Sequence, residues 1–112
     1  MADTPNTWRV VASRQDVLQA GMRDVPIGRR IVLLVGRGGE ILAFQGLCPH
    51  QHARLVEGTL DGDALQCPRH LARFDLDDGT CGGGWQLPAL RRYAVRIDGD
   101  DVLLADPPVA LE

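Results

Sequence analysis

The sequence lacks lysine and has few aromatic side chains. Its 112 residues carry 12 basic groups, all arginine, against 15 carboxylates, and only five aromatic rings. We interpret the missing lysine as codon bias, without functional meaning. The acidic balance, a net charge of −3, argues against nucleic acid as a partner, since such proteins show a basic stripe. With so few large rings, a bound metal would help to stabilise a domain of this size.

Long hydrophobic runs are also missing. The longest aliphatic run, residues 31–35, is far shorter than the roughly 20 residues that a membrane helix needs, so we expect no membrane partner. No apolar stretch after Met1 qualifies as a signal peptide, which favours a cytoplasmic location. The hydrophobic fraction of 45% excludes global disorder, and the length indicates one domain, residues 1–112.

Short strands separated by turns dominate the rest of the pattern. Ser13 is expected to cap a helical turn over residues 14–18 that Gly21 ends. The glycines at 82–84 are not expected in regular structure, and residues 106–112, with two prolines, are expected to be an irregular tail. The expected strands are residues 30–35, 40–44, 64–66, 73–76, 91–97 and 102–105, several of them joined as hairpins. This pattern predicts an all-β fold, an antiparallel sandwich or barrel.

Cysteine and histidine cluster in one stretch. The three cysteines are an odd number, so metal binding or reactivity is a better interpretation than a disulfide framework. The motif is Cys48-Pro-His50, sixteen further residues, then Cys67-Pro-Arg-His70. Each half offers one thiolate and one imidazole, and the proline after each cysteine favours a tight loop. Zinc also takes four such donors, but its usual spacings pair Cys with Cys and His with His, so a structural zinc module stays as an alternative.

The motif resembles the signature of Rieske-type [2Fe–2S] proteins, C-x-H followed by C-x₂-H. The similarity continues through Phe74-Asp75-Leu76, the Asp78-Gly79 turn, the glycine-rich segment and the closing strands, and reaches about residue 105. It implies one [2Fe–2S] cluster per chain, with Cys48 and Cys67 on one iron and His50 and His70 on the other. It also implies a β-sandwich base, residues 1–44 and 86–105, that carries a rubredoxin-like cluster-binding subdomain, residues 45–85, and ends in a tail, residues 106–112.

The resemblance also indicates a branch of the family. Quinol-oxidising members have a disulfide whose cysteines correspond to Ala53 and Arg69, and hydroxyl donors that correspond to Ala72 and Phe74. Without these donors the implied reduction potential is nearer to roughly −150 mV than to +300 mV. The implied protein is a soluble ferredoxin that carries electrons from a flavoprotein reductase to a terminal oxygenase, as in bacterial ring-hydroxylating dioxygenase systems.

Three further expectations remain open at this point. A small subunit of another redox enzyme, of nitrite-reductase type, is the alternative to a free carrier. No nucleophile–base pair is evident, so we expect no catalytic site in this chain. His52, Cys81 and Trp85 are expected to be loop or packing residues rather than ligands.

Overall fold

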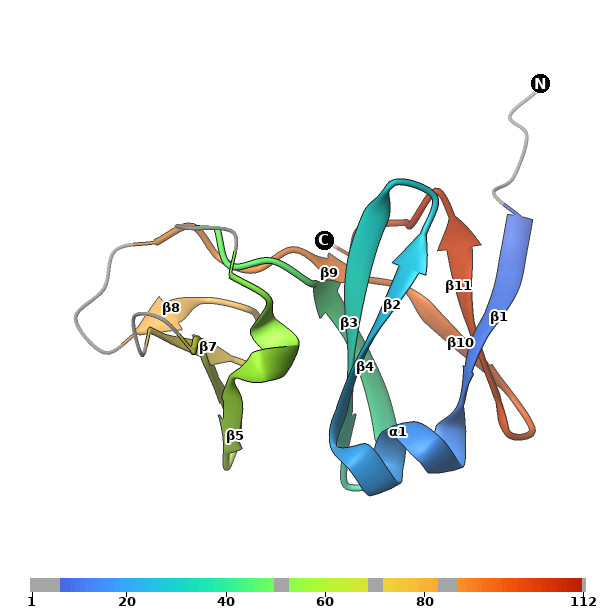
Figure 1. The fold of residues 1–112 in the computed structure, drawn as a ribbon, viewed down its shortest axis with the longest axis horizontal. Helices are drawn as coiled ribbons and strands as arrows, with labels where there is room; N and C mark the ends of the chain where they lie inside the picture. The colour runs from blue at the N-terminus through green and yellow to red at the C-terminus, as the bar shows by residue number, and fades with distance from the viewer. Residues whose placement is uncertain (1–6, 50–52, 69–71, 83–86, 112) are drawn as a thin grey trace.

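The computed structural model describes residues 7–49, 53–68, 72–82 and 87–111. Within these stretches the chain forms three antiparallel sheets, which confirms the all-β prediction (Figure 1). The first sheet has the order β1 (Thr7–Ser13), β11 (Asp101–Asp106), β10 (Val95–Asp98). The second is β2 (Met22–Ile27), β3 (Arg30–Arg37), β4 (Glu40–Gln45), β9 (Arg92–Tyr93). The third is β5 (Thr59–Asp61), β6 (Ala64–Gln66), β7 (Arg73–Asp75), β8 (Cys81–Gly82).

The first two sheets form a sandwich that we call the base, and the third sheet lies beside it in what we call the small lobe (Figure 1). The small lobe comprises the described residues from 46 to 82 and includes a single 3₁₀ turn, Leu55–Glu57. Strand β3 is buried on both faces, because Val32 and Leu34 belong to the core of the base while Leu33 and Val35 belong to the core of the lobe. Since successive strand residues point to opposite faces, β3 is the wall that both cores share.

The helix α1 (Arg14–Ala20) lies where the sequence predicted it, although it is two residues longer. Ser13 Oγ accepts the Asp16 N–H at 3.4 Å, as an N-cap residue does. Gly21 ends the helix with φ +84°, and its N–H donates to the Val17 carbonyl at 2.8 Å. Val17 is fully buried and anchors the helix on the core of the base.

Three strand assignments need correction. Strand β2 was not predicted, yet it pairs along its whole length with β3. Gly82 was excluded from regular structure, yet it pairs with Arg73 in the small sheet, while residues 83–84 lie outside the described residues. The expected strand 91–97 is divided at Ala94, because β9 pairs with β4 and β10 pairs with β11.

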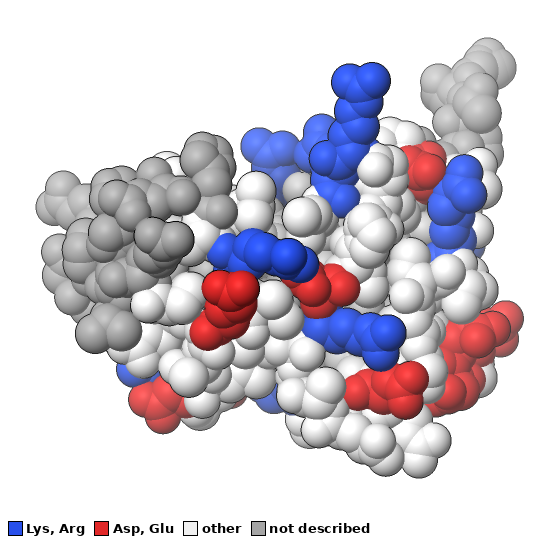
Figure 2. Space-filling view, in the orientation of Figure 1, with Lys and Arg blue, Asp and Glu red and all other residues white. Residues whose placement is uncertain are grey.

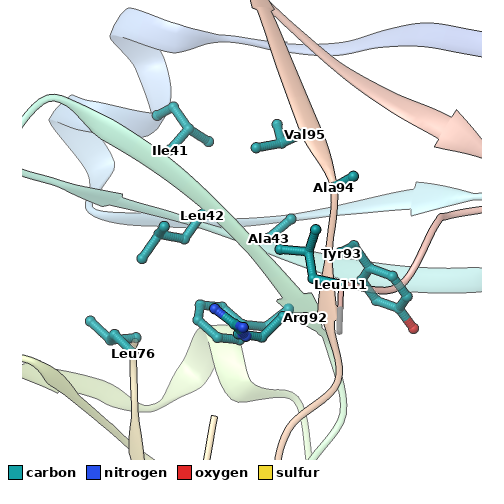
Figure 3. Close-up of a pocket in the computed structure, with 10 residues that line it drawn as sticks. Ile41, Leu42, Ala43, Leu76, Arg92, Tyr93, Ala94, Val95 and Leu111 are labelled. Atoms are coloured by element: carbon teal, nitrogen blue, oxygen red, sulfur yellow. The ribbon is translucent and has the colours of Figure 1, made fainter. Parts of the chain in front are cut away.

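From residue 107 to 111 the C-terminal tail forms no helix or strand, as expected, but one isolated bridge, Tyr93 with Ala110, holds it against the base. The Ala94 N–H donates to the Val109 carbonyl and the Leu111 N–H to the Arg92 carbonyl, both at 2.8 Å. Leu111 thereby reaches the rim of a pocket of about 220 Å³, which also contains Leu76 (Figure 3). No helix among the described residues is long and apolar enough to cross a membrane.

Candidate metal centre

Two loops of equal length begin with the two cysteines of the motif. The Cys48 N–H donates to the Ala53 carbonyl at 2.8 Å, and the Cys67 N–H donates to the Ala72 carbonyl at the same distance. The residues that flank each loop are paired across an antiparallel bridge, Leu47 with Arg54 and Gln66 with Arg73. The two halves of the motif are therefore held by the same backbone arrangement.

The burial and chemistry of the loops fit a metal cluster. Cys48 and Cys67 are fully buried and belong to one hydrophobic cluster with Ala53 and Ala72, the residues that close the loops. Thiolates are soft ligands suited to iron–sulfur clusters, and an apolar wall shields such a site from water. The described donors thus fit a [2Fe–2S] group, whose other predicted ligands, His50 and His70, lie outside the described residues.

A glutamine outside the motif fixes the approach to the first loop. The Gln45 side chain donates through Nε2 to the Leu47 carbonyl at 2.8 Å, and its Oε1 accepts the Arg91 N–H at 2.7 Å. The Gln45 N–H also donates to the Arg91 carbonyl at 2.8 Å. Gln45 therefore ties the residue before Cys48 to a segment that is distant in sequence. Sequence reasoning missed it, because a glutamine at a strand end carries no local signal of this bridge.

The second loop is followed by side chains that cannot donate a hydrogen bond. Ala72 and Phe74 are both fully buried, and neither side chain carries a donor. Phe74 pairs with Leu65 on one side and with Cys81 on the other. Cys81 is half-buried on the edge strand β8, with its Sγ 3.7 Å from the Gly82 carbonyl oxygen, which confirms the expectation of a partly buried packing residue. His52, Arg69 and Trp85 lie outside the described residues.

The acidic turn that follows β7 is an ordered structural turn. Asp78 Oδ1 accepts both the Thr80 N–H, at 2.9 Å, and the Thr80 hydroxyl, at 2.7 Å. These bonds lower the pKa of Asp78 below its usual value, and the bond from the Thr80 backbone N–H contributes most. Directly after the first loop, Arg54 bonds to Asp24, and this bond raises the pKa of the Arg54 guanidinium.

A sandwich base that carries a small sheet with two matched cysteine loops defines a metal-cluster domain, and comparison with known proteins identifies it. The family model of the Rieske [2Fe-2S] domain matches residues 7–94. The chain belongs to this family, whose members bind one [2Fe–2S] cluster per domain.

Individual relatives agree with the family assignment. The ferredoxin component of biphenyl 2,3-dioxygenase from Rhodococcus jostii (strain RHA1) is 34% identical over 84% of this chain and 88% of its own length. The ferredoxin component of the alkene monooxygenase system of Xanthobacter autotrophicus (strain ATCC BAA-1158 / Py2) is 36% identical over 87% of this chain and 80% of its own. A chain in the solved complex of reduced oxygenase and oxidized ferredoxin of carbazole 1,9a-dioxygenase superposes with TM-score 0.79, at 28% identity over 88% of this chain and 93% of its own.

Some relatives are much longer proteins. Apoptosis-inducing factor 3 from Mus musculus and from Homo sapiens is 34% identical over 88% of this chain, but the match spans only 16% of either relative. The same domain therefore occurs both as a small ferredoxin and as a segment of a larger protein.

Proposed function

We propose that this chain is a low-potential Rieske electron carrier that passes single electrons from a flavoprotein reductase to a terminal oxygenase. The observation that carries the proposal is the pair of matched loops that begin with Cys48 and Cys67, in a chain similar along most of its length to oxygenase ferredoxins. The cluster supplies reversible uptake of one electron when bound. The protein itself holds the two thiolates among buried apolar side chains. It also places no hydroxyl donor at positions 72 and 74, next to the second loop.

The proposed ligands are Cys48 and Cys67 for one iron and His50 and His70 for the other. Burial of both cysteines supports the first pair, and the motif supports the second. We propose the subdomain division on the same basis, with residues 45–85 around the cluster, residues 1–44 and 86–105 as base, and residues 106–112 as tail. The cytoplasm, where reduced nicotinamide is available to a flavoprotein reductase, is the proposed location.

The test is metal and sulfide analysis of three variants. We expect about two irons and two inorganic sulfides per chain in the wild type. His50→Ala and His70→Ala should each lose the cluster, whereas Cys81→Ser should keep it. Cys81 is the matched control, because it is a third cysteine in the same lobe. Zinc in place of iron, or cluster loss in Cys81→Ser alone, would overturn the assignment.

A fixed domain within a larger redox assembly is the second candidate, favoured by the match to short segments of longer proteins. A nitrite-reductase-type small subunit is one form of it. Expressed with its neighbouring redox genes, a free carrier should separate from the other components on size exclusion. A fixed subunit should elute with its enzyme at constant stoichiometry.

A further inference from the structure

Two exposed arginines lie beside the first cysteine loop. Arg29 and Arg30, at the turn from β2 to β3, line a hollow of about 340 Å³ together with Cys48 and Pro49. The Gly46 N–H donates to the Ile31 carbonyl at 2.9 Å, which fixes this turn against the segment that leads into Cys48. The positive charges of the turn therefore flank the proposed metal centre.

A third exposed arginine is bonded through its backbone to a residue that lines the same hollow. Arg91 is held to Gln45 by both of its backbone groups, and Gln45 lines the same hollow as Arg29 and Arg30. We call these three residues, Arg29, Arg30 and Arg91, the basic edge. Figure 2 shows arginine side chains at the upper rim of the molecule, by the β2–β3 turn of Figure 1.

The charges of the basic edge are not neutralised within the described part of the chain. None of the three forms an ion pair with a described residue, and Arg30 bonds instead to the Tyr93 hydroxyl at 3.5 Å. Among the residues that the structure describes, two carboxylates border the edge: Asp106, beside Gly28, is paired with Arg9, and Asp24 is paired with Arg54. Both are already engaged, so the edge keeps its positive charge.

Two groups of acidic residues lie away from the basic edge. The turn between β5 and β6 carries Asp61 and Asp63, and because β6 runs away from this turn toward Cys67, they lie at the opposite end of the small sheet. The β10–β11 hairpin carries Asp98, Asp100 and Asp101 at the other end of the base from the β2–β3 turn (Figure 1). A chain of net charge −3 thus presents a local positive field beside its redox centre.

We propose that the basic edge is the docking surface for a redox partner protein that presents carboxylates. The inference rests on the proposed function and adds the chemistry of the partner's contact surface. Charges at the rim of an electron-transfer contact steer association and fix orientation more than they add affinity. A small contact of this kind suits a carrier that must release its partner after each transfer.

The test compares two double variants with the same change in net charge. Arg29→Glu/Arg91→Glu reverses the basic edge and spares Arg30, which bonds to Tyr93. The control, Arg23→Glu/Arg96→Glu, reverses two exposed arginines on β2 and β10 that neither line the hollow nor bond to Gln45. Both proteins are used with the cluster bound, verified by an unchanged visible spectrum.

The first measurement is binding of a fluorescein-labelled oligoglutamate peptide by anisotropy at low ionic strength. The wild type and the control should bind alike, and the basic-edge variant should bind about tenfold more weakly. Equal weakening in both variants would show that only net charge matters and would overturn the proposal. Tighter binding of an oligothymidylate of equal charge would also overturn it, in favour of a phosphate-bearing partner. Peptide binding needs no electron transfer, so its failure is distinct from failure of the proposed function.

The second measurement is oxidation of the reduced protein by small complex ions in stopped flow. The ratio of the rate with anionic hexacyanoferrate(III) to that with cationic hexaammineruthenium(III) reports the local field at the redox centre. This ratio should fall about tenfold in Arg29→Glu/Arg91→Glu and change little in the control. A ratio that falls equally in both variants would contradict a local field from the basic edge.

Discussion

Each cysteine loop ends at an alanine whose carbonyl oxygen accepts the N–H of the cysteine that begins it. The closing bond is made by the backbone, so it places no demand on the side chains of Ala53 and Ala72. Ala72 is nevertheless fully buried, as is Phe74 two residues later. In the quinol-oxidising members that the sequence resembles, hydroxyl donors stand at these two positions, so they are where we propose to test the effect of a donor on the metal centre.

Restoring hydroxyl donors at these positions should raise the reduction potential. Donors to sulfur stabilise the reduced, more negative cluster, so Ala72→Ser/Phe74→Tyr should shift the potential upward by on the order of 100 mV, within the range from roughly −150 to +300 mV. Protein-film voltammetry of the wild type and the double variant measures the shift. The wild-type potential itself should lie below zero.

A second buried phenylalanine provides the control for this experiment. Phe44 lies in the same hydrophobic cluster but on β4, away from the strand that follows the Cys67 loop. Phe44→Tyr adds the same hydroxyl and should shift the potential much less. An equal shift in Phe44→Tyr would assign the effect to general polarity, and a strongly positive wild-type potential would refute the low-potential argument.

At the scale of single elements, the start of α1 depends on the β10–β11 hairpin. Ser13 Oγ donates to Asp100 Oδ2 at 2.5 Å, and the Gln15 N–H donates to Asp100 Oδ1 at 3.0 Å. These two bonds lower the pKa of Asp100 below its usual value, and the bond from Ser13 contributes most. The carboxylate thus acts as a second cap that the sequence around the helix does not contain.

This cap should make stability fall in acid. Because the folded-state pKa lies below the unfolded value of about 3.9, the contribution of Asp100 is complete above that pH and is lost as the pH falls through the folded pKa. Asp100→Asn should therefore lower the melting temperature near neutral pH, and its difference from the wild type should shrink below about pH 4. Circular dichroism melts across this range measure it. Asp98→Asn, on the same hairpin but outside the cap, should change the neutral-pH melting temperature less.

The turn after β7 should tolerate no side chain at Gly79. This residue has φ +79°, and an added Cβ would lie 2.5 Å from the Leu90 carbonyl oxygen. Gly62, at the β5–β6 turn, has φ +61° but open space around it. Gly62→Ala should cost about 1 kcal/mol of unfolding free energy from backbone strain alone, whereas Gly79→Ala should cost about 3 kcal/mol because a clash is added. Urea denaturation of both variants tests this, and equal losses would contradict the role of the Leu90 contact.

The elements predicted correctly from sequence are those with local signals. The hairpin of β3 and β4 follows from two apolar runs around a glycine turn, and α1 follows from Ser13 and Gly21. Strand β2 was not predicted because Asp24 and Pro26 interrupt its apolar sequence pattern. In the structure Val25 and Ile27 are nevertheless buried, with exposed Pro26 between them. The pairing of the tail with the segment around Ala94 depends on the folded base and has no local signal.

The same distinction applies to the candidate site. The spacing of the motif identified the two cysteine loops, since Cys-Pro-His and Cys-Pro-Arg-His are local patterns. The bridge from Gln45 to Arg91 spans 46 positions, and the basic edge joins the β2–β3 turn to Arg91, which directly precedes β9. Both come from the strand order of the second sheet, which a single sequence does not reveal.

At the scale of the whole molecule, arginines of the base hold the acidic turns of the small lobe. Arg37, at the end of β3, forms ion pairs with Asp77 at 2.8 Å and with Asp63 at 3.2 Å, which lie in the two acidic turns of the lobe. The pKa of Arg37 is raised above its usual value, and the hydrogen bond to Asp77 is the largest cause. The Asp77 backbone is held from the base a second time, since Arg92 donates to its carbonyl oxygen. These contacts lie at the end of the lobe opposite the cysteine loops.

Removing the Arg37 contacts should loosen the acidic turns without disturbing the base. In Arg37→Gln the amides of residues 61–63 and 77–79 should exchange with deuterium roughly two- to five-fold faster, because the lost ion pairs are exposed and individually weak. Amides of β3 and β11 should keep their wild-type rates, since their protection comes from the buried core. Arg9→Gln is the matched control, because its ion pair with Asp106, at 2.9 Å, lies entirely within the base. If Arg9→Gln accelerates the lobe turns as much as Arg37→Gln does, then the two parts are coupled through the shared strand β3 and not through this charged contact.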